Sequence, residues 1–190
     1  MSNSAIIKWI ECDGGPHLFI EKRLVGYWMG VIESSYNDKT ITTKLRSGKQ
    51  SNIITDYDRA CDIEEYVGVI SIGNGHGLVI SEDVPRSTWI PAEDGNGGFL
   101  VVLNYISENI EEDLIIEKIK KVDDSLFEST NLQLTIQDNH VCLFAACDYG
   151  PDWLYGCCEF KLKPGTYSIY TVDSYDFDEC SFRIHRLKQA

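Results

Sequence analysis

Short β-type segments separated by tight turns constrain the fold of this chain more than any other feature. Residues 67–72 and 78–81 are rich in Val and Ile and flank a Gly-Asn-Gly-His-Gly turn, a pattern typical of a β-hairpin. Residues 99–106 form an almost continuous apolar run, which predicts a strand buried on both faces. Residues 132–136 alternate apolar and polar side chains, as a half-buried strand does. These segments predict a fold built mostly from antiparallel strands.

Other segments have the same β-branched and aromatic composition. We expect further strands over residues 5–12, 17–20, 24–31, 40–45, 87–90, 141–146, 158–162, 166–172 and 181–187. Turn-forming residues separate them, for example at 94–98 and at the Pro-Gly pair 164–165.

Two segments predict helix. Residues 110–122 begin with acidic residues, end with lysines and keep their apolar side chains near one face, and Asn109 precedes them as a candidate N-cap. Thr55 and Asp58 have the spacing of a capping box, which predicts a short helical turn near residues 56–61. The expected fold class is therefore α+β, with a mostly antiparallel sheet and one principal helix.

A faint internal repeat suggests two related β-rich halves. Residues 78–89 and 143–153 each contain a strand followed by an Asp, a Pro and a Trp. We treat the chain as one domain, residues 1–190, with a hypothetical N-terminal half 1–106 packed closely on a C-terminal half 107–190.

The charge of the chain restricts its partners. Acidic residues outnumber basic residues by 30 to 17, and the net charge is −13. A negative field of this size repels nucleic acid and anionic lipid and attracts basic proteins, so we expect neither nucleic acid nor membrane as a partner. The first residues carry no export signal, and no apolar run is long enough for a membrane span, which predicts a cytoplasmic protein.

No sequence motif assigns catalytic, metal-binding or cofactor-binding chemistry. Because no export signal is present, we expect the seven cysteines to be reduced thiols. They include no Cys-x-x-Cys pair, so we expect no structural zinc site. The glycine-rich loops lead into strands, whereas a phosphate-binding loop opens a helix. No Gly-x-Ser-x-Gly motif is present and the four histidines are scattered, so we expect neither an enzyme nor a cofactor.

Two loops combine carboxylates with aromatic rings, a chemistry suited to binding a basic protein. The alternative is that both are ordinary solvated loops. The candidate binding residues are Asp148, Tyr149, Asp152, Trp153, Tyr155, Asp173, Tyr175, Asp176, Asp178 and Glu179.

Residues 55–61, Thr-Asp-Tyr-Asp-Arg-Ala-Cys, concentrate two carboxylates, a phenol, a guanidinium and a thiol. They form either a functional cluster or a structural one, in which the acids cap a helix, Arg59 pairs with a carboxylate and the remaining side chains pack inward. We favour the structural interpretation, because ion-pair networks occur without catalysis.

The chain resembles the immunity protein 21 family. The resemblance centres on residues 56–61 and extends to a Gly-Gly-Pro turn, two tryptophans and the hairpin at 67–80, with His17 as a departure from the hydrophobic residue expected there. The motif residues, which we interpret as structural, are Trp9, Gly14, Gly15, Pro16, Trp28, Asp56, Tyr57, Asp58, Arg59 and Cys61.

The resemblance implies a bacterial protein that binds and neutralises a cognate polymorphic toxin without catalysis. The negative charge is compatible with a basic toxin such as a nuclease. Two alternatives remain open: a general protein- or ligand-binding module, and a cysteine-dependent hydrolase with Cys61 or Cys147 exposed beside a histidine.

Overall fold

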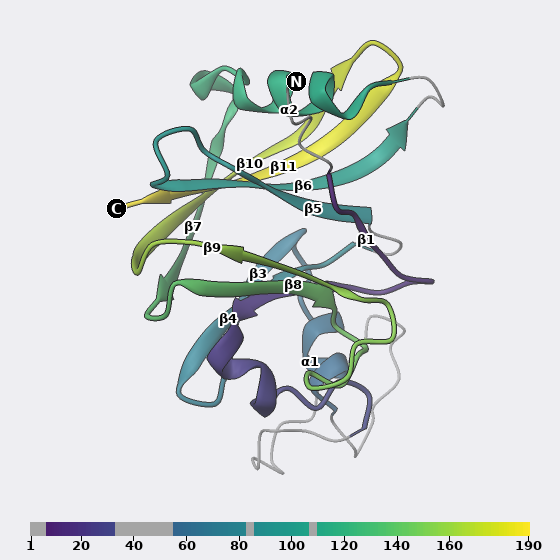
Figure 1. Ribbon diagram of the computed structural model, residues 1–190, viewed down its shortest axis with the longest axis vertical. Coiled ribbons are helices and arrows are strands. Elements are labelled where there is room, and N and C mark those ends of the chain that lie inside the picture. Colours follow the sequence, from purple (N-terminus) through teal and green to yellow (C-terminus); the bar gives the residue numbers. More distant parts are fainter. Residues whose placement is uncertain (1–6, 33–54, 83–85, 107–109) are drawn as a thin grey trace, which may run out of the picture.

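The computed structural model describes residues 7–32, 55–82, 86–106 and 110–190. They form two stacked sheets with a helical layer at each end of the long axis, so that four layers follow one another (Figure 1). All strand pairs in these residues are antiparallel, which confirms the predicted sheet type.

The two sheets have different strand orders. The six-stranded sheet contains, from edge to edge, β1 (Ile10–Glu11), β5 (Arg86–Pro91), β6 (Gly97–Ile106), β11 (Cys180–Gln189), β10 (Gly165–Phe177) and β7 (Glu128–Ile136). The five-stranded sheet contains β3 (Val67–Ile72), β4 (Gly75–Ile80), β2 (His17–Glu21), β8 (His140–Ala145) and β9 (Cys157–Lys161).

Helices cover the outer faces of both sheets. The helix α2 (Glu112–Lys120) lies on the six-stranded sheet, and α1 (Asp56–Cys61) and the 3-10 helix η1 (Lys22–Tyr27) lie against the five-stranded sheet (Figure 1). A second 3-10 helix, η2 (Asp124–Leu126), follows α2. No helix in these residues is long and apolar enough to cross a membrane.

Three apolar cores hold the four layers together. The first lies between the sheets and includes Phe19 and Leu100, the second lies under α2 and includes Ile119 and Phe182, and the third lies under α1 and includes Trp28. Neighbouring side chains of a strand point to opposite faces, so β6 contributes to two of these cores. The prediction that residues 99–106 are buried on both faces is confirmed for residues 99–103.

Several sequence predictions are confirmed and others are wrong. The hairpin β3–β4, the turn before β6 and the strands β8, β9 and β11 lie where the patterns indicated. Residues 24–31 are not a strand but begin within η1, because Leu24, Val25 and Trp28 recur at helical spacing and face one core. The helix α2 starts at Glu112 rather than residue 110, and Glu111 precedes it without a side-chain cap.

Three further predictions concern two strands and a helix cap. The N-terminal strand is shorter than expected and pairs only at Ile10–Glu11. The predicted strand 40–45 and the proposed cap Asn109 lie outside the described residues.

The strand order repeats between the two parts of the chain. From the centre outward, the six-stranded sheet reads β6, β5, β1 on one side and β11, β10, β7 on the other. The five-stranded sheet reads β2, β4, β3 on one side and β8, β9 on the other. Each part therefore contributes matching strands to both sheets, which supports the hypothesis of two related halves. In this structural correspondence β4 is equivalent to β9, whereas the sequence repeat made β4 equivalent to β8.

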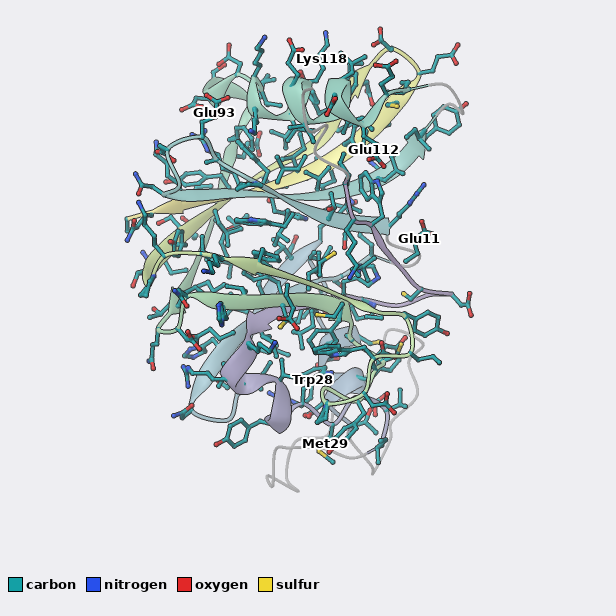
Figure 2. All side chains as sticks on the ribbon, in the orientation of Figure 1. Glu11, Trp28, Met29, Glu93, Glu112 and Lys118 are labelled. Atoms are coloured by element: carbon teal, nitrogen blue, oxygen red, sulfur yellow. The ribbon has the colours of Figure 1, made fainter. Side chains whose placement is uncertain are left out.

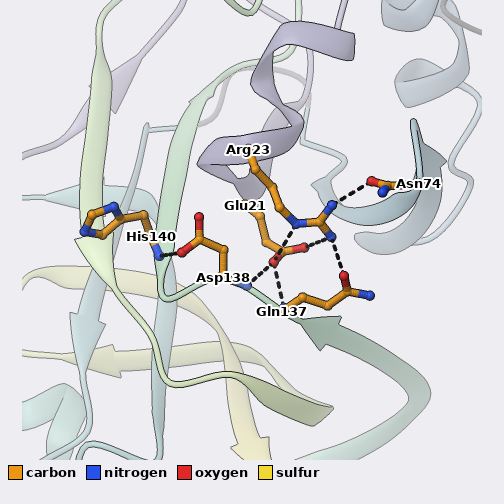
Figure 3. A network of polar contacts seen from close by, with 6 residues as sticks. All are labelled: Glu21, Arg23, Asn74, Gln137, Asp138 and His140. Atoms are coloured by element: carbon orange, nitrogen blue, oxygen red, sulfur yellow. Dashed lines mark hydrogen bonds and ion pairs between the residues drawn. The ribbon is translucent and has the colours of Figure 1, made fainter.

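A fully buried carboxylate joins four segments at one side of the five-stranded sheet. Figure 3 shows Glu21 accepting hydrogen bonds from the backbone amides of Gln137 and Asp138, at 2.6 and 2.5 Å. Arg23 binds the same carboxylate through Nη2 at 2.8 Å and donates to the Asn74 side chain at 2.6 Å. Because a buried charge needs such partners, this network fixes η1 against the β3–β4 and β7–β8 turns.

A buried hydrogen bond connects the two sheets. The His17 Nδ1 atom lies 2.6 Å from the Ser87 hydroxyl oxygen, and both side chains are fully buried. Burial lowers the pKa of His17 from 6.5 to about 3. The folded chain therefore binds fewer protons at His17 than the unfolded chain between these two pH values.

We predict that acidification destabilises the protein through this histidine. Stability should be fully present above pH 6.5 and should fall by about 2 kcal/mol between pH 6.5 and 5 because of His17 alone. Urea unfolding at several pH values should show a shallower pH dependence for His17→Gln than for the wild type. The matched control His140→Gln, on an exposed hairpin residue, should keep the wild-type slope.

Candidate functional site

The helix α1 begins with the capping box that the sequence predicted. The backbone amide of Asp58 donates to the Thr55 hydroxyl oxygen at 3.0 Å, and the Thr55 amide donates to Asp58 Oδ2 at 2.8 Å. Two amides at the helix start are thereby satisfied, which stabilises a helix of only six residues.

The carboxylate of Asp56 is fully buried beneath this helix. Its Oδ2 accepts the Met29 amide at 2.9 Å, and its Oδ1 pairs with Arg59 Nη1 at 2.9 Å. Arg59 Nη2 also donates to the Ser71 carbonyl at 2.6 Å. The Asp56–Arg59 pair thus connects α1, the segment after η1 and β3, which supports the structural interpretation of this cluster.

Tyr57 connects α1 to two glycines. Its backbone amide donates to the Gly30 carbonyl at 3.0 Å, and its hydroxyl occupies the space where a Cβ on Gly15 would lie, only 2.0 Å away. Gly15 also has φ +89°, a conformation that favours glycine. Burial raises the pKa of the Tyr57 hydroxyl, and the half-buried Cys61 adds to this effect.

The loop between β8 and β9, residues 146–156, is bonded to the segment that follows η1. Trp28 Nε1 donates to the Ala146 carbonyl at 2.9 Å, the Gly150 amide donates to the Trp28 carbonyl at 3.0 Å, and the Val31 amide donates to the Cys147 carbonyl at 3.3 Å. We call residues 27–32, α1 and residues 147–155 together the α1 end. In Figure 2 the labels of Trp28 and Met29 mark the α1 end.

Asp148 organises the β8–β9 loop from within. Its side chain is 6% exposed, burial raises its pKa, and its Oδ2 accepts the Tyr155 amide at 3.2 Å. Tyr155 in turn donates its hydroxyl to Asp13 Oδ2 at 3.1 Å, and Trp153 packs on Phe144 with 6.0 Å between ring centroids. These candidate residues therefore contact the protein itself and stiffen the loop.

The side chains that the α1 end exposes are partly different from those predicted. Asp152 is exposed as expected, and Tyr149 is half-buried. Leu154 is 82% exposed, Ile32 64% and Val31 54%. Sequence analysis ranked aromatic rings as the anchors and missed these aliphatic residues. The sequence did offer a signal for Leu154, since it is an apolar residue between two aromatic residues in an acidic loop.

The second acidic loop, residues 173–179, lies at the opposite end of the molecule. It is mostly strand rather than loop: residues 173–177 end β10, and only Asp178 and Glu179 form the turn to β11. This hairpin end lies beside α2, so the structure does not bring the two candidate loops together (Figure 1). The Phe177 ring stacks on Phe182 with 5.3 Å between ring centroids, and it contacts Tyr175 with 5.7 Å between centroids. Phe177 and Tyr175 both pack against the core under α2.

The carboxylates of this second loop have mixed surroundings. Asp173 lies 3.7 Å from Arg183, and Asp176 accepts from Ser174. Asp178 and Glu179 are exposed at the tip.

The remaining motif residues also have structural contacts. Trp9 packs against the core under α2, Gly14 has φ +153°, and the Pro16 carbonyl accepts the Ala146 amide at 2.9 Å. None of these residues presents a group with an evident chemical role.

Three thiols lack the lowered pKa of a catalytic nucleophile, and Cys142, whose pKa is lowered by a hydrogen bond with Cys157, is fully buried. Burial raises the pKa of Cys147 to about 11, and it raises those of Cys12 and Cys158 as well, whereas a reactive cysteine needs a lowered pKa. The two buried histidines contact hydroxyl groups, of Ser87 and of Thr171. Within the described part of the chain, no three His, Cys, Asp or Glu side chains are placed to hold a metal ion.

The fold and the α1 end define a two-sheet β protein with a braced loop surface. Comparison with known families identifies its relatives: residues 8–178 match the family model described as Immunity protein 21. The chain therefore belongs to the Immunity protein 21 family, as the sequence resemblance indicated. No curated protein and no solved structure matches it.

We predict that Arg59→Ala lowers the free energy of unfolding by about 3 kcal/mol, because it leaves the buried Asp56 carboxylate without its guanidinium partner. The matched control is Lys121→Ala, which removes an exposed ion pair to Glu117 and should change the free energy of unfolding much less. Urea denaturation measures both. Equal effects of the two substitutions would contradict the structural role of Arg59.

Proposed function

We propose that this chain is an immunity protein that protects the producing bacterium by binding a cognate toxin stoichiometrically in the cytoplasm, without catalysis. The family match over residues 8–178 carries this proposal. A stoichiometric inhibitor needs a rigid, complementary surface of about 800 Å² per partner and no reactive group. The raised thiol pKa values favour this function over a cysteine-dependent hydrolase.

The α1 end is the surface that we assign to the toxin. Its loops are cross-braced by hydrogen bonds between residues 28–31 and 146–150, so little ordering entropy is lost on binding. Leu154, Ile32 and Val31 expose apolar side chains at this end, and Asp152, in the same loop as Leu154, is also exposed. An apolar centre with charged neighbours is the usual composition of a protein–protein interface.

The electrostatics favour a basic toxin, such as a nuclease. The net charge of −13 accelerates the encounter with a positively charged protein and weakens binding to like-charged ones. Loop 173–179 contributes to this field, but its aromatic rings pack into the protein's own core. We therefore assign steering, rather than docking, to Asp176, Asp178 and Glu179.

The proposal is tested with the toxin encoded in the neighbouring reading frame. The chain should rescue cells that express this toxin, and the purified proteins should form a complex in isothermal titration calorimetry. Leu154→Asp should weaken the complex at least tenfold, because it places a charge at the apolar centre of the α1 end. Its thermal unfolding should stay unchanged, since the side chain is largely in solvent.

The matched control is Leu126→Asp, an exposed leucine on η2, which should bind like the wild type. If Leu154→Asp also binds like the wild type, the toxin surface lies elsewhere. If no protein of the same genome is inhibited, the immunity function itself is wrong.

A further inference from the structure

A groove of about 660 Å³ opens at the side of the protein where the two sheets have their β5 and β9 edges. Consecutive residues of both strands line it, from Thr88 to Pro91 and from Cys157 to Lys161. A cavity on one face of a sheet would involve alternate residues, since neighbouring side chains point to opposite faces. The groove therefore runs along the two strand edges. Ile116 of α2 and Ile7 complete its apolar wall.

Backbone groups of β9 that point away from β8 also border the groove. The Leu162 amide donates to the Asn139 carbonyl across the β8–β9 pair. Because backbone groups alternate in direction along a strand, those of Phe160 and Cys158 also point toward β8, whereas those of Glu159 and Lys161 point outward. Lys8 Nζ binds the outward carbonyl of Cys157. Among the described strands, none pairs with the outer edge of β9.

The repeated strand order indicates what this position lacks. In the first half of the five-stranded sheet, β4 has β3 as its outer neighbour. Its counterpart β9 has no described strand at the equivalent place. The six-stranded sheet leaves the same side open, because β1 pairs only with Arg86 and Ser87 of β5, whereas its counterpart β7 pairs along much of β10. One added strand would complete the repeat.

The charges around the groove select the composition of such a strand. Lys8, Lys120 and Lys161 line it, a local positive excess on an acidic protein. Glu159 is the only acidic residue in the lining, and it pairs with Lys22 at 2.5 Å. The aromatic wall on the inner side consists of Trp89 stacked on Phe160, with ring centroids 5.0 Å apart.

We propose that this groove binds an extended segment of a partner protein, which adds to β9 as an antiparallel strand. Its apolar side chains point inward onto Trp89, Phe160 and Ile116, and its alternating carboxylates lie near Lys161 and the other lysines. Main-chain hydrogen bonds to Glu159 and Lys161 supply affinity, and the alternation supplies specificity. This inference is independent of the α1 end and of the toxin function.

A lysine at a strand edge also protects proteins from aggregation, which is the competing explanation for Lys161. Protection alone does not account for an apolar groove of this size beside the edge, since such grooves bind ligands. A small amphiphilic acid would occupy the groove without using the β9 backbone. The test therefore distinguishes a peptide that pairs with the β9 backbone from a small molecule that only fills the apolar groove.

The probe is a short fluorescein-labelled peptide in which valine alternates with aspartate, titrated with the full chain and followed by fluorescence anisotropy. We expect saturable binding, and slower amide hydrogen exchange at Glu159 and Lys161. Lys161→Glu should weaken binding about tenfold, because it replaces an attraction by a repulsion. The matched control Lys188→Glu, exposed on β11, should bind like the wild type.

Four results would overturn the proposal. The first is no binding of the alternating peptide, and the second is equal binding of an isomer whose valines and aspartates are grouped in blocks. The third is unchanged amide exchange in the saturated complex, and the fourth is equal affinity of Lys161→Glu. Binding of dodecanoate without binding of the peptide would identify the groove as a small-molecule site instead.

Discussion

The buried carboxylate of Asp56 is the interaction on which the α1 end depends. A charge without solvent is stable only if hydrogen bonds and an opposite charge surround it. The Met29 amide, from the segment after η1, and Arg59, three residues further along α1, supply these, and Arg59 also binds the Ser71 carbonyl of β3. Glu21 does the same at the neighbouring side with amides of the β7–β8 turn. Together the carboxylates of Asp56 and Glu21 position the loops around α1 and η1, because helices of six residues are too short to hold them alone.

This arrangement separates the residues that build the surface from those that it exposes to solvent. Trp28, Asp56 and Arg59 are buried or nearly so, and their bonds run to backbone atoms of other segments. Leu154 and Ile32 lie on the segments so held, with their side chains in solvent. A family can therefore keep the same scaffold while the exposed positions change with the partner.

Sequence patterns predicted local structure well where the determinants were local. The capping box of Thr55 and Asp58 and the glycine-rich β3–β4 turn each depend on residues a few positions apart. The patterns failed for η1, because glycines and aromatics obscured the helical spacing of Leu24, Val25 and Trp28. They did not indicate the contacts of Trp153 with Phe144 on β8, or of Tyr155 with Asp13, which lies far away in the sequence.

The sequence by itself determined the antiparallel β architecture, the acidic field and the family, because alternation, turn chemistry, charge and local motifs are properties of neighbouring residues. Only the tertiary structure decided which strands are neighbours and which loops share a surface. It placed the two acidic segments at opposite ends, revealed the repeated strand order and showed that no described strand pairs with the outer edge of β9. These features arise from contacts between residues far apart in the chain, where burial, rather than local preference, selects the partner.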